Sequence, residues 1–230
     1  DFTEIAQGAV RALGEPEAPT DLLLSLDVRL RHILVDEFQD TSISQFELIE
    51  RLTTGWEAGW QPDAAGDHGR TLFLVGDPMQ SIYRFREAEV GLFLHARRSG
   101  IGAVRLEPLT LSTNFRSQAG VVDWVNAAFP RILPPVEDEA AGAVSFARSE
   151  PFHAGLAGEA VRWHGFFHDG SPAGRSAARA AEAARVAELV TAARLERPAG
   201  SIAILVRGRS HLLDIVPALK QADLRFRAID

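Results

Sequence analysis

Two adjacent carboxylates follow the first strongly apolar run of the sequence. Asp36 and Glu37 come directly after residues 32–35, which read His-Ile-Leu-Val. Such a run is typical of a buried strand in a parallel sheet, and ligands of open α/β sheets bind beyond the carboxyl ends of their strands. One carboxylate can hold Mg²⁺, a hard cation that prefers oxygen, while the other orients or deprotonates an attacking water. Taken alone, the pair also fits a plain acidic loop.

An aromatic and basic segment follows the second apolar run, residues 71–75. It reads Gly-Asp-Pro-Met-Gln-Ser-Ile-Tyr-Arg-Phe-Arg over residues 76–86. The Gln80 amide can donate a hydrogen bond to a phosphate oxygen without adding charge. Tyr83 and Phe85 alternate with arginines, which suits single-stranded nucleic acid because each base that stacks on a ring contributes ~1–3 kcal/mol. The alternative interpretation is that both rings are buried in the core.

A third segment, residues 111–117, reads Leu-Ser-Thr-Asn-Phe-Arg-Ser. We expect this segment to form a loop, and an arginine at a loop tip beside a nucleotide, here Arg116, would stabilise the charge that develops on a transferred phosphoryl group, an effect worth ~10³–10⁵ in rate. The neighbouring Phe115 would stack on a nucleobase. On its own the segment also fits a helix-capping loop with an ordinary surface arginine.

In this order the three segments closely resemble motifs II, III and IV of the superfamily-1 DNA helicases of the UvrD/Rep type. Residues 76–86 are most similar to the AddA/RecB-like branch, whose members often carry a helicase fused to a nuclease. Residues 201–207 also resemble the following strand of the family's second motor domain. The resemblance is strong over most of residues 30–130 and weak over residues 200–230.

The resemblance implies a role for each nucleotide-facing residue. Asp36 would coordinate the Mg²⁺ of Mg-ATP, and Glu37, the second candidate metal ligand, would activate the hydrolytic water. Gln80 would sense the γ-phosphate. Phe115 would pack on adenine, and Arg116 would be the arginine finger contributed by a second RecA-like domain. ATP and Mg²⁺ are therefore the expected cofactors.

The resemblance also implies a DNA track. Tyr83, Phe85 and Arg86 would contact single-stranded DNA, and hydrolysis in the cleft between two RecA-like domains would ratchet that strand with 3′→5′ polarity. The expected partner is single-stranded or duplex-junction DNA, in repair or recombination. A nuclease domain or a partner subunit is a further expectation for the full-length protein.

The sequence contains no phosphate-binding P-loop, which needs the pattern Gly-x-x-x-x-Gly-Lys-Ser/Thr. Lys220, the only lysine, lies between Leu219 and Gln221. The resemblance places the family's P-loop before residue 1 and its motifs V and VI after residue 230. We therefore expect an internal piece of a longer protein, unable to hydrolyse ATP unaided.

Hydrophobic periodicity predicts the elements that position these residues. Helices are expected over residues 2–13, 22–30, 41–52, 89–98, 120–129, 173–194 and 210–221, and strands over residues 32–36, 71–75, 104–111, 161–167, 201–206 and 224–229. Alternation of this kind is typical of an α/β fold with a parallel sheet. The resemblance makes it a RecA-like fold of the P-loop NTPase type. Residues 1–103 would close the first motor domain and residues 104–230 would open the second, with an irregular or inserted region near residues 134–158.

Composition excludes several classes of protein. The chain has 230 residues, no cysteine and a net charge of −7, which rules out a disulfide scaffold and disfavours a uniformly basic nucleic-acid binder. No apolar run approaches the ~18 residues of a membrane span. We expect no membrane partner and a cytoplasmic location.

Two other functions fit part of the pattern. One is a nucleic-acid-binding or partner-binding module that has lost motor activity. The other is a Mg²⁺-dependent nuclease built on four acids, Asp36, Glu37, Asp40 and Asp77. The nucleotide motifs explain these acids better, and a module without motor chemistry has no need for the intact motif residues.

Overall fold

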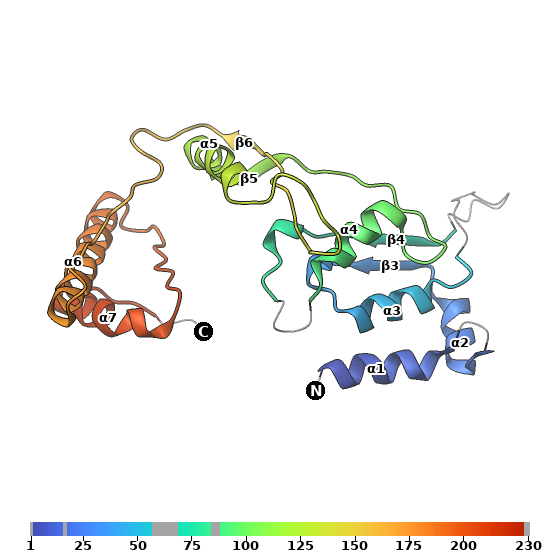
Figure 1. Cartoon of the computed structure of the whole chain (residues 1–230). Helices are drawn as coiled ribbons and strands as arrows, with labels where there is room; N and C mark the ends of the chain where they lie inside the picture. Colours follow the sequence, from blue (N-terminus) through green and yellow to red (C-terminus); the bar gives the residue numbers. More distant parts are fainter. Residues whose placement is uncertain (1, 16–17, 57–68, 84–87, 228–230) are drawn as a thin grey trace. The chain divides into compact units, whose positions relative to one another are not determined.

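The computed structural model describes residues 2–15, 18–56, 69–83 and 88–227. The chain divides into two compact units, residues 1–161 and residues 162–230 (Figure 1). Helices alternate with short parallel strands in the first unit, so the predicted α/β class is confirmed. The predicted boundary between two motor domains, at residues 103/104, is a different statement from this division into compact units, because compactness does not identify a motor domain. The boundary stays a prediction.

The elements of the first unit are mostly short. Its helices are α1 (Phe2–Leu13), α2 (Asp21–Arg29), α3 (Ile43–Leu52), α4 (Val90–Ser99) and α5 (Ala119–Ala128). Its strands are β1 (Gly14–Glu15), β2 (Ala18–Pro19), β3 (His32–Val35), β4 (Thr71–Leu74), β5 (Thr113–Gln118) and β6 (Glu150–His153). Single 3-10 turns are η1 (Phe38–Asp40), η2 (Pro78–Gln80) and η4 (Phe129–Arg131).

Strands β3 and β4 pair in parallel, with His32 opposite Thr71 and Val35 opposite Leu74. Helix α3 lies between them in the chain, which confirms the predicted strand–helix–strand unit. The helix begins after Ser42, whose hydroxyl accepts a hydrogen bond from the Gln45 backbone while the Gln45 side chain accepts one from the Ser42 backbone. This reciprocal capping fixes where α3 starts, six residues after Glu37.

A hydrophobic cluster packs one face of this sheet against α3 and α4. Its buried members are Phe38, Ile49, Ala96 and Ile101, and half-buried residues of both strands pack against them. Phe38 contacts the rings of Phe46 and Phe93, with centroids 6.3 and 6.1 Å away. The residue that follows Glu37 is thus an anchor in the core.

Helix α1 lies along α3 on the outside of this cluster (Figure 1). Arg51 of α3 forms ion pairs with Glu47 at 2.7 Å and with Glu15 at 3.1 Å, and it donates to the carbonyl oxygen of Gly14. The hydrogen bond to Glu47, together with the charge of both acids, raises the pKa of Arg51 above its usual value. Arg51 therefore stays charged and joins the N-terminal segment to α3.

A second parallel pair, β5 and β6, carries the third motif. Residues 134–149 are irregular and are held on α4 by ion pairs, including Arg98 with Glu139 at 2.9 Å and Arg97 with Glu137. Asn126 of α5 binds the backbone of Ser149 through both ends of its amide. The region near 134–158 thus contains one strand, β6, within otherwise irregular chain.

The second unit is a helical pair, α6 (Pro172–Glu196) and α7 (Leu212–Gln221), with the short turn η5 (Arg209–His211) before α7. Ala183 and Ala187 of α6 pack against Ile215 and Leu219 of α7. Small side chains on α6 let the two helices approach closely. No helix in the described part of the chain has the length and apolar character needed to cross a membrane.

Four predicted strands are wrong. Residues 104–111, 161–167, 201–206 and the described part of 224–229 are not strands. Val104 pairs only with Ile101, across a tight turn in which Gly102 has φ of 54°, and Pro108 has no N–H to donate. The other three runs have no neighbouring strand among the described segments, and a strand needs such a neighbour to satisfy the hydrogen bonds of its backbone.

Ile101 provides a test of the cluster that fastens the sheet. Ile101→Ala should lower the free energy of unfolding by ~2–5 kcal/mol, because it leaves a cavity at a fully buried position. Urea unfolding of the purified chain measures this. Ile132→Ala is the matched control, because Ile132 is largely exposed and its truncation should change stability by less than about 0.5 kcal/mol. Equal effects of the two substitutions would contradict the described core.

Candidate functional site

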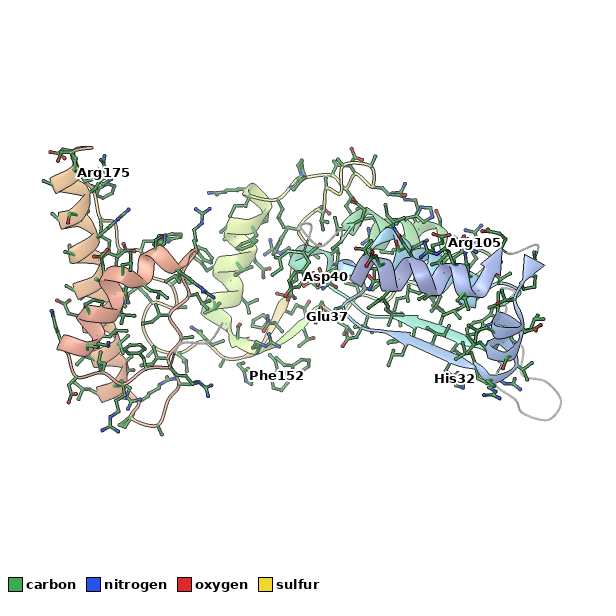
Figure 2. All side chains as sticks on the ribbon, turned by 90° about the horizontal axis from the view of Figure 1, so that it is seen from below. His32, Glu37, Asp40, Arg105, Phe152 and Arg175 are labelled. Atoms are coloured by element: carbon green, nitrogen blue, oxygen red, sulfur yellow. The ribbon has the colours of Figure 1, made fainter. Side chains whose placement is uncertain are left out.

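Asp36 and Glu37 lie at the carboxyl end of β3, and both are exposed. The backbone of Glu37 is left-handed, with φ 51° and ψ 40°, and its N–H donates to Oδ1 of Asp36 at 2.9 Å. This turn ends the strand and sends Phe38 into the core, where its N–H donates to the carbonyl of Val75 at 2.9 Å. Figure 2 shows Glu37 and Asp40 near each other, at the end of the sheet opposite His32.

The segment Gly76–Ser81 follows β4 at the same end of the sheet. Asp77 organises it, since Oδ1 accepts from the Met79 N–H at 3.0 Å and Oδ2 accepts from the Gln80 side chain at 2.8 Å. Gln80 is exposed. We call residues 36–40 and 76–81 together the β3–β4 edge. The structure brings Asp36, Glu37 and Gln80 to this one edge, as the parallel pairing requires.

Gln39 connects the two halves of the β3–β4 edge, and it is a residue that the sequence motifs did not single out. Its amide nitrogen donates to Oε2 of Glu37 at 2.7 Å, and its amide oxygen accepts the N–H of Asp77 at 3.0 Å. Gln39 is only 1% exposed. The signal that could have found it is an uncharged amide between acids, directly after the core residue Phe38.

Phe115 and Arg116 lie in β5 rather than at a loop tip. Asn114 holds the local backbone, because its side-chain oxygen accepts from the N–H groups of Arg116 and Ser117 at 3.0 and 2.8 Å. The Phe115 ring is exposed and contacts Phe152 of β6, with centroids 4.8 Å apart. Figure 2 labels Phe152 on that strand.

The hydrogen bonds and ion pairs of the described residues do not join Phe115 or Arg116 to the β3–β4 edge. The Arg116 guanidinium has no such partner among the described residues and is exposed. Tyr83, the first predicted DNA contact, is half-buried just beyond the edge. Phe85 and Arg86 lie outside the described residues.

The β3–β4 edge has the donor atoms that Mg²⁺ prefers. Asp36 and Glu37 present exposed carboxylates, and Oδ1 of Asp40 is buried with no hydrogen-bond partner among the described residues. Mg²⁺ is commonly held by one or two carboxylates together with substrate phosphates, so this set fits it. Within the described ranges, no three or more His, Asp or Glu side chains are grouped as a complete metal site. The four acids of the nuclease alternative, all of which the structure describes, therefore form no metal cluster.

A wide, open hollow of about 1100 Å³ lies elsewhere, between α4 and residues 136–143. Among its charged lining residues, His95 and Arg98 both contact Glu139, at 2.8 and 2.9 Å. None of the predicted site residues that the structure describes lines this hollow, so the candidate chemistry remains at the β3–β4 edge.

Known proteins that are similar to this chain carry helicase names. Residues 1–100 match the family described as UvrD/REP helicase N-terminal domain. A protein of Exiguobacterium sibiricum, named as one subunit of an ATP-dependent helicase/nuclease, is 37% identical over 150 residues, covering 64% of this chain and 11% of that protein. Proteins of the same name from Pelotomaculum thermopropionicum and Staphylococcus aureus are 34% and 32% identical over 148 and 160 residues, covering 61% and 67% of this chain and 11% and 12% of theirs.

These comparisons confirm the resemblance to UvrD/Rep-type helicases and to the helicase/nuclease branch. The UvrD N-terminal domain has a RecA-like helicase fold, so the predicted RecA-like fold is also confirmed. The chain spans about 11% of the length of the curated relatives it matches. The roles predicted for individual site residues stay predictions.

Gly76 provides a test of the β3–β4 edge. A Cβ at this position would collide with Oε1 of Gln39, so Gly76→Ala should displace the amide and lower the free energy of unfolding by ~1–3 kcal/mol. Urea unfolding measures the change. Gly8→Ala is the control, since apart from its chain neighbours and the backbone of its own helix no atom lies within 4 Å of the new methyl, and alanine should stabilise α1 by about 0.5–1 kcal/mol. A neutral or stabilising Gly76→Ala would refute the close packing of Gln39.

Proposed function

We propose that this chain is part of a longer ATP-dependent DNA helicase or translocase that acts in DNA repair or recombination. ATP would be hydrolysed between two RecA-like domains, and single-stranded DNA would move with 3′→5′ polarity. The observation that carries the proposal is the β3–β4 edge, where the carboxylates after one strand meet the phosphate-sensing loop after its parallel neighbour. The names of the relatives support the ATP-dependent helicase and add a nuclease as a further part of the whole protein.

Each residue of the edge has a distinct proposed task. Asp36 and Glu37 offer oxygen ligands for Mg²⁺, which when bound would offset the charge of the phosphates. Glu37 would accept a proton from the attacking water, since a carboxylate is a suitable general base. The Gln80 amide, now held by Asp77 at 2.8 Å, would exchange that partner for the γ-phosphate and report its presence.

Residues outside the edge complete the proposal. Phe115 would pack against the adenine ring, and Arg116 would approach the γ-phosphate as the arginine finger. Tyr83, Phe85 and Arg86 would hold DNA by stacking and by phosphate contact. Because Tyr83 follows Gln80 by three residues, a change in the hydrogen bonds of Gln80 has a short path to the DNA. A cytoplasmic location is part of the same proposal.

The proposal is tested by ATP turnover of the full-length protein, with and without single-stranded DNA. Glu37→Gln should lower kcat by ~10²–10⁴ because the general base is lost. Arg116→Ala should lower it by ~10³–10⁵ because the charge on the transferred group is no longer stabilised. Turnover should rise with DNA in the wild type.

Two exposed residues of the same types serve as controls. Glu50→Gln on α3 and Arg131→Ala in η4 each remove a charge of the same sign as the tested residue but outside the motifs, and they should leave kcat unchanged. Absence of turnover in the wild type, with DNA still bound, would favour the binding-module alternative. Turnover that survives Glu37→Gln would remove the proposed role of that carboxylate.

A further inference from the structure

The side-chain amide of Gln39 is buried. It hydrogen-bonds to Glu37, the proposed water-activating residue, but is not itself exposed at the proposed reaction centre. It is 1% exposed, while Glu37, two residues before it, is exposed. Burying an amide costs about 1–3 kcal/mol for each end that is left without a hydrogen bond. Both ends of Gln39 are paired, and each pairs with a different half of the β3–β4 edge.

The donor end of the amide fixes a carboxylate. Nε2 lies 2.7 Å from Oε2 of Glu37, a short bond to a charged acceptor, and 3.4 Å from Oδ2 of Asp40. An exposed glutamate would otherwise sample several rotamers, since it has three side-chain torsions. The hydrogen bond from this buried donor therefore favours one orientation of the Glu37 carboxylate.

The acceptor end fixes the loop after β4. Oε1 accepts the N–H of Asp77 at 3.0 Å, and the main-chain carbonyl of Gln39 accepts the hydroxyl of Ser81 at 3.3 Å. Asp77 in turn holds Gln80. The absence of a side chain at Gly76 leaves room for Oε1. Gln39 therefore bonds the loop at both sides of the proposed phosphate sensor.

We propose that Gln39 is a positioning residue for hydrolysis, which sets the orientation of Glu37 according to the position of the Asp77–Ser81 loop. The inference rests on the proposed function, because it assumes that Glu37 activates water. Glutamine is suited to the task since its amide donates at one end and accepts at the other. Glutamate has no donor for Glu37, and methionine has neither a donor nor a comparable acceptor.

Two substitutions separate the ends of the amide. Gln39→Glu keeps an oxygen for the Asp77 N–H but sets a carboxylate against Glu37, whereas Gln39→Met keeps the length of the side chain and removes both bonds. Each should lower kcat of the full-length protein by up to ~10²-fold, the usual cost of an ångström-scale misplacement. The KM for ATP should stay near the wild-type value, because Gln39 does not contact the nucleotide in this proposal.

A second measurement uses the nucleotide-free protein. Amide hydrogen exchange of the peptide covering residues 76–82 should accelerate in Gln39→Met, which frees the Asp77 N–H, and accelerate less in Gln39→Glu, which still accepts from it. Asn126→Asp is the matched control: it also changes a buried amide that joins two segments through both ends, but at Ser149, outside the β3–β4 edge. It should leave both kcat and the exchange of residues 76–82 unchanged.

The outcomes distinguish this inference from the function on which it rests. Turnover that requires Glu37 but is unchanged in both Gln39 variants would overturn the inference and leave the proposed function intact. A loss of kcat in Asn126→Asp equal to that in Gln39→Glu would also overturn it, since general destabilisation would then explain both. Wild-type protein without DNA-stimulated turnover would overturn the proposed function and this inference together.

Discussion

The parallel pairing of two four-residue strands determines where the candidate chemistry lies. With Val35 opposite Leu74, the segments after β3 and β4 emerge at one edge, and the hydrogen bond from Phe38 to Val75 extends the pairing beyond the strands. A shift of one residue would send Phe38 away from the hydrophobic cluster and turn the carboxylates toward the core. The cluster of Phe38, Ile49, Ala96 and Ile101 therefore fixes the register, and the register brings the two motifs together.

Local patterns predicted the elements that carry their own signal. The apolar runs at 32–35 and 71–75 became β3 and β4, and seven helices lie close to their predicted positions. Four expected strands did not form because an apolar run favours extended backbone, but a strand also needs a neighbour, which periodicity does not supply; in residues 104–111 Pro108 also lacks an N–H to donate. The third motif shows the converse, since β5 forms where a loop was expected because β6 lies alongside.

The candidate site was predictable in its residue types and less so in its connections. Asp36, Glu37 and Gln80 meet at one edge, as strand order implies. The amide bridge of Gln39 depends on three-dimensional contact with Asp77, 38 residues along the chain, and no local pattern encodes such a bond. The hydrogen bonds from the Arg116 and Ser117 backbone to the Asn114 side chain likewise depend on the folded conformation of β5 rather than on charge.

At Glu37 the backbone conformation and the proposed chemistry favour different residues. The left-handed backbone favours glycine, whereas the proposed activation of water needs a carboxylate. A residue with a Cβ pays ~1–2 kcal/mol for this conformation, which glycine adopts freely. A protein engineer who ranked substitutions by fold stability would therefore choose glycine here and would delete the proposed water-activating carboxylate. The same reasoning applies to natural drift: a lineage released from the need to hydrolyse nucleotide would gain by losing this acid first. If the proposed role of Glu37 holds, the residue at position 37 in a relative would indicate whether that role has been kept.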